Sequence, residues 1–280
     1  MTILAHISDL HFGTEDDRLA AALLDDLNGN TGPRPDLVVI SGDLTQRARR
    51  AQFRAAASYL AQIAPPRLVV PGNHDIPLYD VFTRFLRPRD RWVKYITHDL
   101  QPTHLGADIA VVGVDTARRF TFKDGRVNQD QVARACSFFA KYPSRWKILV
   151  AHHPFVVPTH VKQKDLVDNA EDAIPLLEAA QVDLILSGHL HLPYAEDVVD
   201  YNNDRHSILA VHAGTSISSR TRGEPQGYNW LVFAPDHVSI IHRVWDGARF
   251  VEQDARSYRR QGFTVELVET PVPTEDHLSI

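Results

Sequence analysis

The chain has 280 residues, of which 44% are hydrophobic and 23% charged, a composition that is typical of a folded globular protein and excludes a disordered one. A formal net charge of −5 argues against a protein that coats nucleic acid, because that task requires a basic surface. The single cysteine, Cys136, excludes an intrachain disulfide and is expected in the core. No apolar run approaches the roughly 18 residues of a membrane-spanning helix, and no signal-peptide pattern follows Met1, so we expect a cytoplasmic protein.

Strands and helices are expected to alternate through the first two thirds of the chain, where short apolar runs separate segments with helical apolar spacing. After residue 194 the pattern changes to short strands joined by hairpin turns. These patterns predict an α/β fold with two sheets in one layered domain over 1–269, followed by a flexible tail over 270–280. The expected strands begin at residues 3, 37, 68, 109, 147, 184, 208, 230 and 238, and the expected helices cover about 14–28, about 46–63, a segment capped at Asn128, and about 169–181.

Residues 76–100 interrupt this alternation, because aromatic and aliphatic side chains are interleaved there with arginines. Pro88 is expected to divide the segment into one or two short amphipathic helices. Two interpretations stay open. The segment is a packed connection between neighbouring elements, or it is a cap that forms one wall of a substrate site, since it directly follows the loop at Gly72.

Five of the apolar runs end alike, with a small or turn-forming residue and then an Asp, Asn or His. Turn-forming residues stop a strand, so these polar side chains should lie just beyond the carboxyl ends of strands, where ligands bind in open α/β sheets. Each residue alone could be an ordinary turn or cap, but five coincident motifs favour one assembled site. In chain order the runs deliver Asp9 and His11, Asp43, Asn73 with His74 and Asp75, His152 with His153, and His189 with His191.

The chemistry of these side chains predicts metal binding. Asp9 and His11 are separated by one residue, as are His189 and His191, so in extended chain each pair points to one side. Carboxylate, amide oxygen and imidazole without thiolate suit manganese, iron, cobalt or zinc at a reactive centre, in preference to a structural zinc or calcium site. Some seven ligands exceed the needs of one ion, whereas two ions roughly 3.5–4 Å apart that share a carboxylate would use them all.

The motifs resemble the five-block signature of the calcineurin-like metallophosphoesterases, and within that family the chain is most similar to bacterial cyclic-nucleotide and glycerophosphodiester phosphodiesterases. The blocks are Asp9-x-His11, Gly42-Asp43, Gly72-Asn73-His74-Asp75, His152-x-Pro154 and Gly188-His189-x-His191. The resemblance implies a four-layer α/β/β/α sandwich with two mixed sheets and a dinuclear centre. One metal ion would be held by Asp9, His11, Asp43 and His191, and the other by Asp43, Asn73, His152 and His189, with Asp43 bridging. The family's usual spacing before Pro154 favours His152 over His153.

His74 and Asp75 are expected to act beside the metal ions. His74 adjoins a ligand without being needed as one, so it is placed to stabilise the transition state or to protonate the leaving oxygen. Asp75 could orient that imidazole. Arg220 and Arg222, in a later loop, either bind a phosphate or are simply exposed. Because the motifs themselves contain no Arg or Lys, we expect a preference for diesters over monoesters.

These features predict a metal-dependent phosphoric diester hydrolase that attacks a small soluble phosphodiester with a hydroxide bridging two metal ions. An alternative with the same fold is a hydrolase of a lipid-linked nucleotide diphosphate, of the UDP-diacylglucosamine type, in which 76–100 touches an acyl chain or a membrane surface. A catalytically silent binding module is a further alternative, and the complete ligand set argues against it. No nucleic-acid polymer is expected as a partner, and a homo-oligomer stays open.

Overall fold

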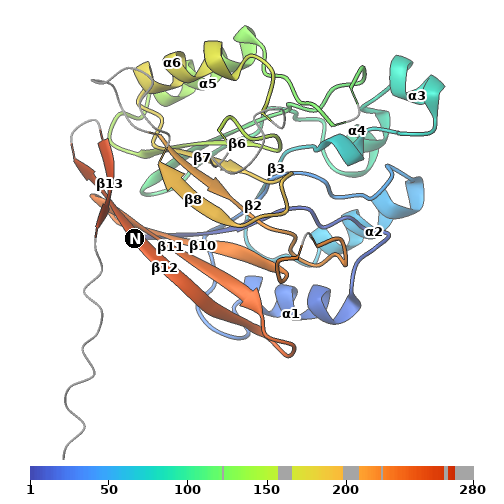
Figure 1. The fold of residues 1–280 in the computed structure, drawn as a ribbon, viewed down its shortest axis with the longest axis horizontal. Coiled ribbons are helices and arrows are strands. Elements are labelled where there is room, and N and C mark those ends of the chain that lie inside the picture. The colour runs from blue at the N-terminus through green and yellow to red at the C-terminus, as the bar shows by residue number, and fades with distance from the viewer. Residues whose placement is uncertain (122, 157–165, 198–207, 222, 262–263, 269–280) are drawn as a thin grey trace, which may run out of the picture.

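Two mixed β-sheets lie face to face in the computed structural model, which describes residues 1–121, 123–156, 166–197, 208–221, 223–261 and 264–268 (Figure 1). The first sheet contains, in spatial order, β13 (Thr264–Val268), β12 (Phe250–Gln261), β11 (His237–Trp245), β10 (Gly227–Phe233), β1 (Thr2–Ile7), β2 (Leu37–Ile40) and β3 (Arg67–Val69). The second sheet contains β4 (Thr103–Leu105), β5 (Ile109–Val114), β6 (Trp146–Ala151), β7 (Leu184–Ser187), β9 (Leu209–His212) and β8 (Tyr194–Asp197).

The strands with metal-binding motifs are parallel neighbours within each sheet. In the first sheet β1 pairs in parallel with β2, and β2 with β3, while the strands from β10 to β13 are antiparallel. In the second sheet β5, β6, β7 and β9 are parallel, and β4 and β8 are antiparallel edge strands. Parallel neighbours bring their carboxyl ends to the same edge, and this places the motif loops side by side.

Helices cover the outer faces of both sheets. Helices α5 and α6 lie on the second sheet, whereas α1 and α2 lie on the first (Figure 1). The predicted α/β/β/α sandwich with two mixed sheets is therefore confirmed. The helices are α1 (Asp17–Leu27), α2 (Arg50–Leu60), α3 (Val81–Leu86), α4 (Asp90–Tyr95), α5 (Gln129–Phe139) and α6 (Ala170–Ala179), and a short 3₁₀ helix covers Asn73–Asp75.

The apolar core consists of three layers because successive side chains on a strand point to opposite faces. In β1, Leu4 joins the layer between the two sheets, and Ala5 packs in the layer beneath α1 and α2. In β6, Ile148 faces the other sheet, and Leu149 packs beneath α5 and α6. Strands buried on both faces need apolar residues at every position, which explains the continuous apolar runs in the sequence.

Helix α2 begins at Arg50, four residues later than the sequence predicts. Ala48 has a left-handed backbone, with φ of 50°, which interrupts a helix. The side-chain oxygen of Gln52 accepts the backbone N–H groups of Arg47 and Arg49, so the residues before the helix are held in a turn. This turn also fixes the main chain of Gln46, which has a role in the site described below.

The segment 76–100 contains the two helices α3 and α4 on either side of Pro88, as predicted. Arg84 of α3 is buried and donates to the carbonyl oxygens of Pro77, Arg118, Arg119 and Thr121. Trp92 of α4 is fully buried in the layer that α2 shares. These contacts show that the segment is packed against the loop after β5 and against α2.

The remaining expectations have different outcomes. Strands β4, β8, β12 and β13 were not predicted, and in β12, the longest of them, charged and polar residues conceal the strand pattern. Cys136 is half-buried and packs against the layer beneath α5 and α6, so it lies at the edge of the core. The predicted tail 270–280 lies outside the described residues. Within the described residues, no helix is long and apolar enough to cross a membrane.

Candidate metal centre

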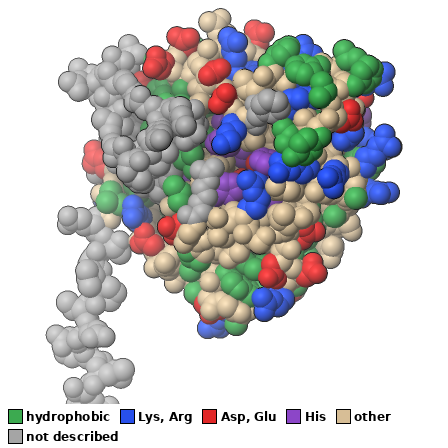
Figure 2. Space-filling model, turned by 45° about the vertical axis from the view of Figure 1, so that its right-hand side comes forward, with side chains coloured by type: hydrophobic (Ala, Val, Ile, Leu, Met, Phe, Trp, Pro, Cys, Tyr) green, Lys and Arg blue, Asp and Glu red, His purple; other side chains and the backbone are tan. Residues whose placement is uncertain are grey.

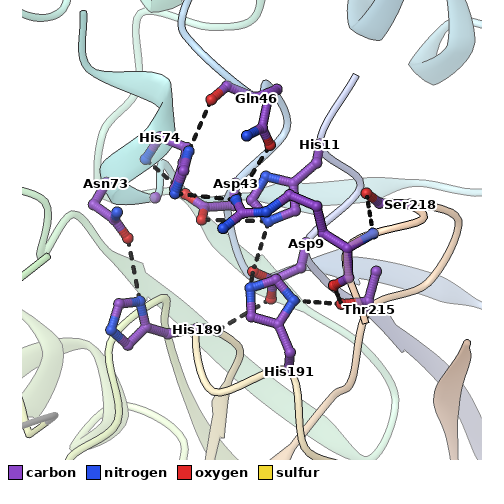
Figure 3. Close-up of polar contacts among 12 residues, drawn as sticks. Asp9, His11, Asp43, Gln46, Asn73, His74, His189, His191, Thr215 and Ser218 are labelled. Atoms are coloured by element: carbon purple, nitrogen blue, oxygen red, sulfur yellow. Dashed lines mark hydrogen bonds and ion pairs between the residues drawn. The ribbon is translucent and has the colours of Figure 1, made fainter. Parts of the chain in front are cut away.

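The loops that follow β1, β2, β3, β6 and β7 meet at one edge of the two sheets, as the strand-end motifs predict. Their polar side chains point toward one another from segments far apart in the sequence (Figure 3). Backbone hydrogen bonds tie the loops together, since the N–H of Asp9 donates to the carbonyl of Gly42 and that of Gly188 to the carbonyl of His152. The residues brought together are Asp9, His11, Asp43, Asn73, His74, His152, His153, His189 and His191.

Five of the predicted metal ligands have a left-handed backbone. The φ angles are 53° at Asp9, 47° at His11, 52° at Asp43, 71° at His189 and 56° at His191. Such a conformation costs a non-glycine residue on the order of 1–3 kcal/mol, and it persists where the surrounding structure enforces it, characteristically at functional sites. The loops are closely packed here, since a Cβ atom at Gly188 would collide with the side chains of Ser8 and Asp9.

A first cluster consists of Asp9, His11 and His191, all buried. The Oδ1 atom of Asp9 lies 3.4 Å from the Nε2 atom of His11 and 3.4 Å from the Nε2 atom of His191. The two imidazole rings are stacked, with their centres 5.2 Å apart. One oxygen and two nitrogen donor atoms therefore converge, which is a set that could hold a metal ion.

A second cluster consists of Asn73, His152 and His189. The Oδ1 atom of Asn73 lies 3.1 Å from Nε2 of His152 and 3.2 Å from Nδ1 of His189, and these two nitrogen atoms are 3.3 Å apart. All three side chains are buried. An amide oxygen and two imidazoles thus form another converging set of donor atoms.

Asp43 lies between the two clusters. Its Oδ2 atom is 3.4 Å from Nε2 of His152 in the second cluster and 3.8 Å from Nε2 of His11 in the first. Its Oδ1 atom accepts the backbone N–H of His74 at 2.8 Å, which fixes the orientation of the carboxylate. Gly72 makes this approach possible, because a Cβ atom there would occupy the position of the Asp43 carboxylate.

Neighbouring oxygen atoms fix the orientation of two of the imidazoles. Nδ1 of His152 lies 2.8 Å from the carbonyl oxygen of Ser41, to which it donates its proton. Nδ1 of His191 contacts the hydroxyl of Thr215, and that hydroxyl in turn donates to the carbonyl of Arg220 at 3.1 Å. In both neutral rings the Nε2 atom is therefore unprotonated and faces the centre, as a metal-ligating histidine requires.

Charge interactions within the site outweigh the effect of burial on several groups. Burial alone would raise the pKa of Asp9, but His191 and the other histidines bring it below its ordinary value. The pKa of Asp43 is lowered in the same way, chiefly by His152. Burial disfavours a charge on His152, yet Asp43 raises its pKa to about 9, whereas burial and the neighbouring His152 lower the pKa of His189 to about 3.

The donor atoms fit metal ions better than they fit one another. Asp9 Oδ1 and His11 Nε2 are buried, and neither makes a hydrogen bond within the described part of the chain. Without a metal ion, the raised pKa of His152 places a proton on Nε2, which faces Asn73 Oδ1 at 3.1 Å. A cation could take the place of this proton and would give the buried atoms without a hydrogen bond a partner. The oxygen and nitrogen donors, without thiolate, suit transition-metal ions.

His152 and His153 both lie beside the second cluster but differ in their contacts. Nδ1 of His153 lies 2.8 Å from the hydroxyl of Thr116, and burial together with His189 and His152 lowers the pKa of His153 well below its ordinary value. His153 also lies near His189, with ring centres 4.7 Å apart. Only His152 of the two is within 4 Å of both Asp43 and Asn73 among the described contacts, which favours His152 as a ligand.

His74 lies beside the first cluster with both ring nitrogens engaged. Nδ1 donates to the carbonyl oxygen of Gln46 at 2.8 Å (Figure 3), and Nε2 is 3.3 Å from Nη1 of Arg220. The same Nη1 atom lies 3.2 Å from Oε1 of Gln46. One nitrogen of His74 is close enough to His11 and Asp43 to join a metal-binding group, but its existing partners distinguish it from the unpaired atoms of His11.

Asp75 does not orient the imidazole of His74, and that expectation was wrong. Its carboxylate accepts the backbone N–H groups of Leu44, Thr45 and Gly72 and the hydroxyl of Thr45. These bonds join the loop after β2 to the loop after β3. Burial, and then the charge of Asp43, raise the pKa of Asp75 to about 6. The carbonyl of Gln46 orients His74 instead. The sequence does not indicate this contact, because every residue has a main-chain carbonyl.

Of the two arginines predicted near the substrate, Arg220 reaches the site through His74, and Arg222 lies outside the described residues. Sequence reasoning missed Gln46, Ser41 and Thr215, which hold imidazoles or Arg220 in place. Their positions carry a weak signal, because Ser41 and Gln46 flank the Gly42-Asp43 motif and Thr215 follows β9.

The centre opens to the surface on one face of the molecule. Figure 2 shows histidine side chains at the bottom of a hollow, with Lys or Arg and hydrophobic side chains on its rim. The described exposed hydrophobic residues of the segment 76–100 are Tyr79, Val81, Phe82, Phe85 and Leu86, and Phe120 of the loop after β5 contacts Phe85 with ring centres 5.7 Å apart.

Several curated proteins have similar sequences. A cAMP/cGMP dual specificity phosphodiesterase of Mycobacterium tuberculosis is 27% identical over 274 residues, which cover 86% of this chain and 78% of that protein. A glycerophosphodiester phosphodiesterase of Enterobacter lignolyticus is 37% identical over 95 residues, or 31% of this chain. That match spans about one third of the relative's own length, since it covers 33% of it.

Solved structures share the fold at low sequence identity. A purple acid phosphatase from yellow lupin seeds superimposes with a TM-score of 0.63 and 16% identity, covering 91% of this chain and 53% of that one. A dimetal phosphatase from Danio rerio gives a TM-score of 0.63 and 14% identity, covering 90% and 98% of the two chains. At these identities the likeness shows the fold.

The sequence profile of the calcineurin-like phosphoesterase family matches residues 3–193. This range includes every predicted metal ligand from Asp9 to His191 and more than half of the chain. The chain therefore belongs to the calcineurin-like phosphoesterase family, a family of metal-dependent phosphoester hydrolases.

Proposed function

We propose that this chain is a dinuclear-metal phosphodiesterase that hydrolyses a small phosphodiester, and that residues 1–269 form its single catalytic domain. The position of Asp43 carries the proposal, because its Oδ2 atom lies 3.4 Å and 3.8 Å from imidazole nitrogens of the two clusters. Two ions bound there would supply Lewis-acid charge and make water a nucleophile at neutral pH. One ion would be held by Asp9, His11, Asp43 and His191, and the other by Asp43, Asn73, His152 and His189.

The residues around these ligands hold them in a fixed orientation before substrate binds. Ser41 and Thr215 keep the Nε2 atoms of His152 and His191 directed into the centre. The backbone N–H of His74 holds the Asp43 carboxylate between the two clusters, where it would bridge two ions. Preorganisation of this kind avoids the cost of ordering the ligands during the reaction.

His74 and Arg220 would act on the leaving side of the phosphate. Gln46 fixes the imidazole through Nδ1, so Nε2 is the ring atom that faces Arg220 and the site. In the neutral ring Nε2 accepts an N–H of Arg220, so His74 would donate to the leaving oxygen as the imidazolium, which burial disfavours by lowering the pKa of His74 and which the charge of Asp43 favours. Arg220 would bind a non-bridging phosphate oxygen with its remaining N–H groups.

A diester with small alcohol groups fits the charge of this site. A diester carries one negative charge, whereas a monoester carries nearly two and benefits from several cationic side chains. Within the described residues, Arg220 is the arginine that contacts His74 at the site. The named activities of the relatives support the same substrate class, since one is a cAMP/cGMP phosphodiesterase and another a glycerophosphodiester phosphodiesterase.

The test is a hydrolysis panel with the purified chain supplemented in turn with manganese, iron, zinc or cobalt. The panel contains bis-p-nitrophenyl phosphate, p-nitrophenyl phosphate, 2′,3′- and 3′,5′-cyclic nucleotides, and glycerophosphodiesters. Elemental analysis of the most active preparation should give about two metal ions per chain. An active preparation with a single tightly bound ion would contradict the dinuclear proposal, and inactivity toward every diester would contradict the proposed substrate class.

The exposed apolar residues on α3 and just before it favour a second candidate, the hydrolysis of a lipid-linked nucleotide diphosphate. Tyr79, Phe82 and Leu86 are 71%, 72% and 63% exposed, and such a group of large hydrophobic residues is typical of a surface that binds an acyl chain or a partner. Adding a UDP-sugar lipid to the panel distinguishes the candidates. Faster hydrolysis of that lipid than of any soluble diester would support the second one.

A further inference from the structure

A groove with a volume of about 550 Å³ lies between the connection of α3 to α4 and the loop that follows β5. Four arginines line it, Arg89, Arg118, Arg119 and Arg126, together with the single carboxylate of Asp115 and the ring of Phe120. None of the proposed metal ligands lines this groove, and neither does His74 or Arg220. We propose that it is a second, non-catalytic site that binds a phosphorylated small molecule of about the size of a mononucleotide.

The charges in the groove are unbalanced in favour of an anion. Arg89 binds both oxygens of Asp115, at 2.7 Å each, and also donates to the carbonyl of Ala117 at 2.7 Å. The one carboxylate that lines the groove is thus already occupied. Burial and the charges of Arg89 and Arg126 lower the pKa of Arg118, although Asp115 and the nearby Asp168 act in the opposite direction. A bound anion would relieve this repulsion among the guanidinium groups.

The arginines also have unused hydrogen-bond donors. Nη1 of Arg89 and Nε of Arg118 are buried, and neither finds an acceptor within the described residues. A buried charged donor without an acceptor costs free energy, so a small rotation that presents it to a ligand oxygen is favourable. Arg126 is exposed, and its side chain makes no hydrogen bond or ion pair in the described part of the chain. Planar guanidinium groups with free N–H donors match the oxygen geometry of a phosphate.

The remainder of the groove suits an organic group attached to that phosphate. Leu100 and Ala117 form part of its apolar lining, and Phe120 at its edge is 71% exposed. The guanidinium of Arg119 lies over the Phe120 ring at 4.7 Å, so a cation and an aromatic ring are presented together. A volume of about 550 Å³ lies in the usual range for small-molecule sites. These features favour an organic phosphate over inorganic phosphate.

The test measures binding of AMP, inorganic phosphate and adenosine to the full chain loaded with metal, by isothermal titration calorimetry. AMP can also bind the metal centre, so the measurement is repeated with Asp43→Ala. We expect AMP to bind this variant, phosphate to bind it more weakly than AMP, and adenosine to show no measurable binding. Loss of all AMP binding in Asp43→Ala would place the ligand at the metal centre and overturn the proposal.

Substitutions in the groove test which of its arginines bind AMP. Arg126→Gln in the Asp43→Ala background should weaken AMP binding roughly 10-fold, or about 1.4 kcal/mol, and adding Arg118→Gln should weaken it further. The matched control is Arg50→Gln/Arg54→Gln on the exposed face of α2, which removes equal charge and should leave binding unchanged. Arg118 donates to the carbonyl of Arg126, so the single Arg126→Gln variant is the test if the double variant unfolds.

In the metal-loaded chain with Asp43 intact, Arg126→Gln should change kcat/KM for bis-p-nitrophenyl phosphate less than two-fold, because the groove contains no group assigned to hydrolysis. Unchanged AMP affinity in Arg126→Gln, or an equal loss in the α2 control, would show that the groove is not a specific site. This result is independent of the proposed phosphodiesterase activity, since binding is measured without turnover.

Discussion

Replacing His74 by alanine separates a chemical role from a structural one. The backbone N–H that holds Asp43 Oδ1 at 2.8 Å is retained in the variant, so the Asp43 carboxylate should keep its position between the two clusters. The two side-chain contacts that are lost reach the carbonyl of Gln46 and the guanidinium of Arg220, and neither is a proposed metal ligand. Metal content and fold should therefore persist, and what disappears is the imidazole that would protonate the leaving oxygen in its charged form.

The expected loss for His74→Ala is on the order of 10²–10⁴-fold in rate, which corresponds to about 3–5 kcal/mol of transition-state stabilisation. The loss should be largest for a diester with a poor leaving group, such as a glycerophosphodiester. It should shrink for bis-p-nitrophenyl phosphate, because p-nitrophenolate leaves with little protonation. This dependence follows from the position of Nε2, the ring atom that faces Arg220 and the site, since Nδ1 is bound to the carbonyl of Gln46.

The assay compares kcat/KM of wild type and variant on both esters, with metal content measured on the same samples. His98→Ala is a matched control, since His98 is an exposed histidine on the connection between α4 and β4 and should behave as wild type. Loss of metal in His74→Ala would show that His74 is a ligand. An equal loss of rate for good and poor leaving groups would show that His74 does not act on the leaving oxygen.

Three further predictions concern the metal centre and stability. Asp43→Ala should lower metal occupancy at both positions and abolish hydrolysis, because its carboxylate faces both clusters; elemental analysis showing one position still fully loaded would contradict bridging. The value of kcat/KM should be higher for bis-p-nitrophenyl phosphate than for p-nitrophenyl phosphate. The reverse order would indicate that Arg220 is one of several cationic side chains that bind a monoester. Burial lowers the pKa values of His6 and His212 from 6.5 to about 3, so both are neutral in the folded protein while the unfolded chain takes up protons first. Their contribution to stability is present above pH 6.5 and lost as the pH falls toward 3, by about 1.4 kcal/mol per pH unit for each histidine. His212→Asn should flatten this dependence in urea titrations at pH 4 to 7, and an unchanged slope would contradict it.

The sequence by itself determined the strands that precede the motifs and the inventory of the site. Each motif strand is buried on both faces, so its residues are apolar at every position and the strand is visible as a run such as Leu37–Ile40. The turn residue after each run is also local information. Because parallel strands end at a common edge, the residues after them could be predicted to meet without knowledge of the order of the strands.

Only the tertiary structure decided which atoms face one another. The choice of His152 over His153, two adjacent residues of the same type, rests here on contacts with Asp43 and Asn73 that come from other strands. The partner of the His74 imidazole is a main-chain oxygen of Gln46, whereas Asp75, the nearest carboxylate in the sequence, binds backbone N–H groups instead. His74 and Asp75 are adjacent in the chain, but their side chains point in different directions because the backbone turns sharply within the 3₁₀ helix.

Two contacts made by arginines also depend on the tertiary structure, and they join residues far apart in the sequence. Arg220 meets His74 across 146 positions of sequence, and Arg89 meets Asp115 across 26, because the packing of the two sheets brings their loops together. Local spacing determines the periodicity of a helix or strand, which involves neighbours a few residues apart. It carries no information on which loops of two packed sheets come into contact, and the His74–Arg220 pair and the arginine-lined groove both depend on that packing.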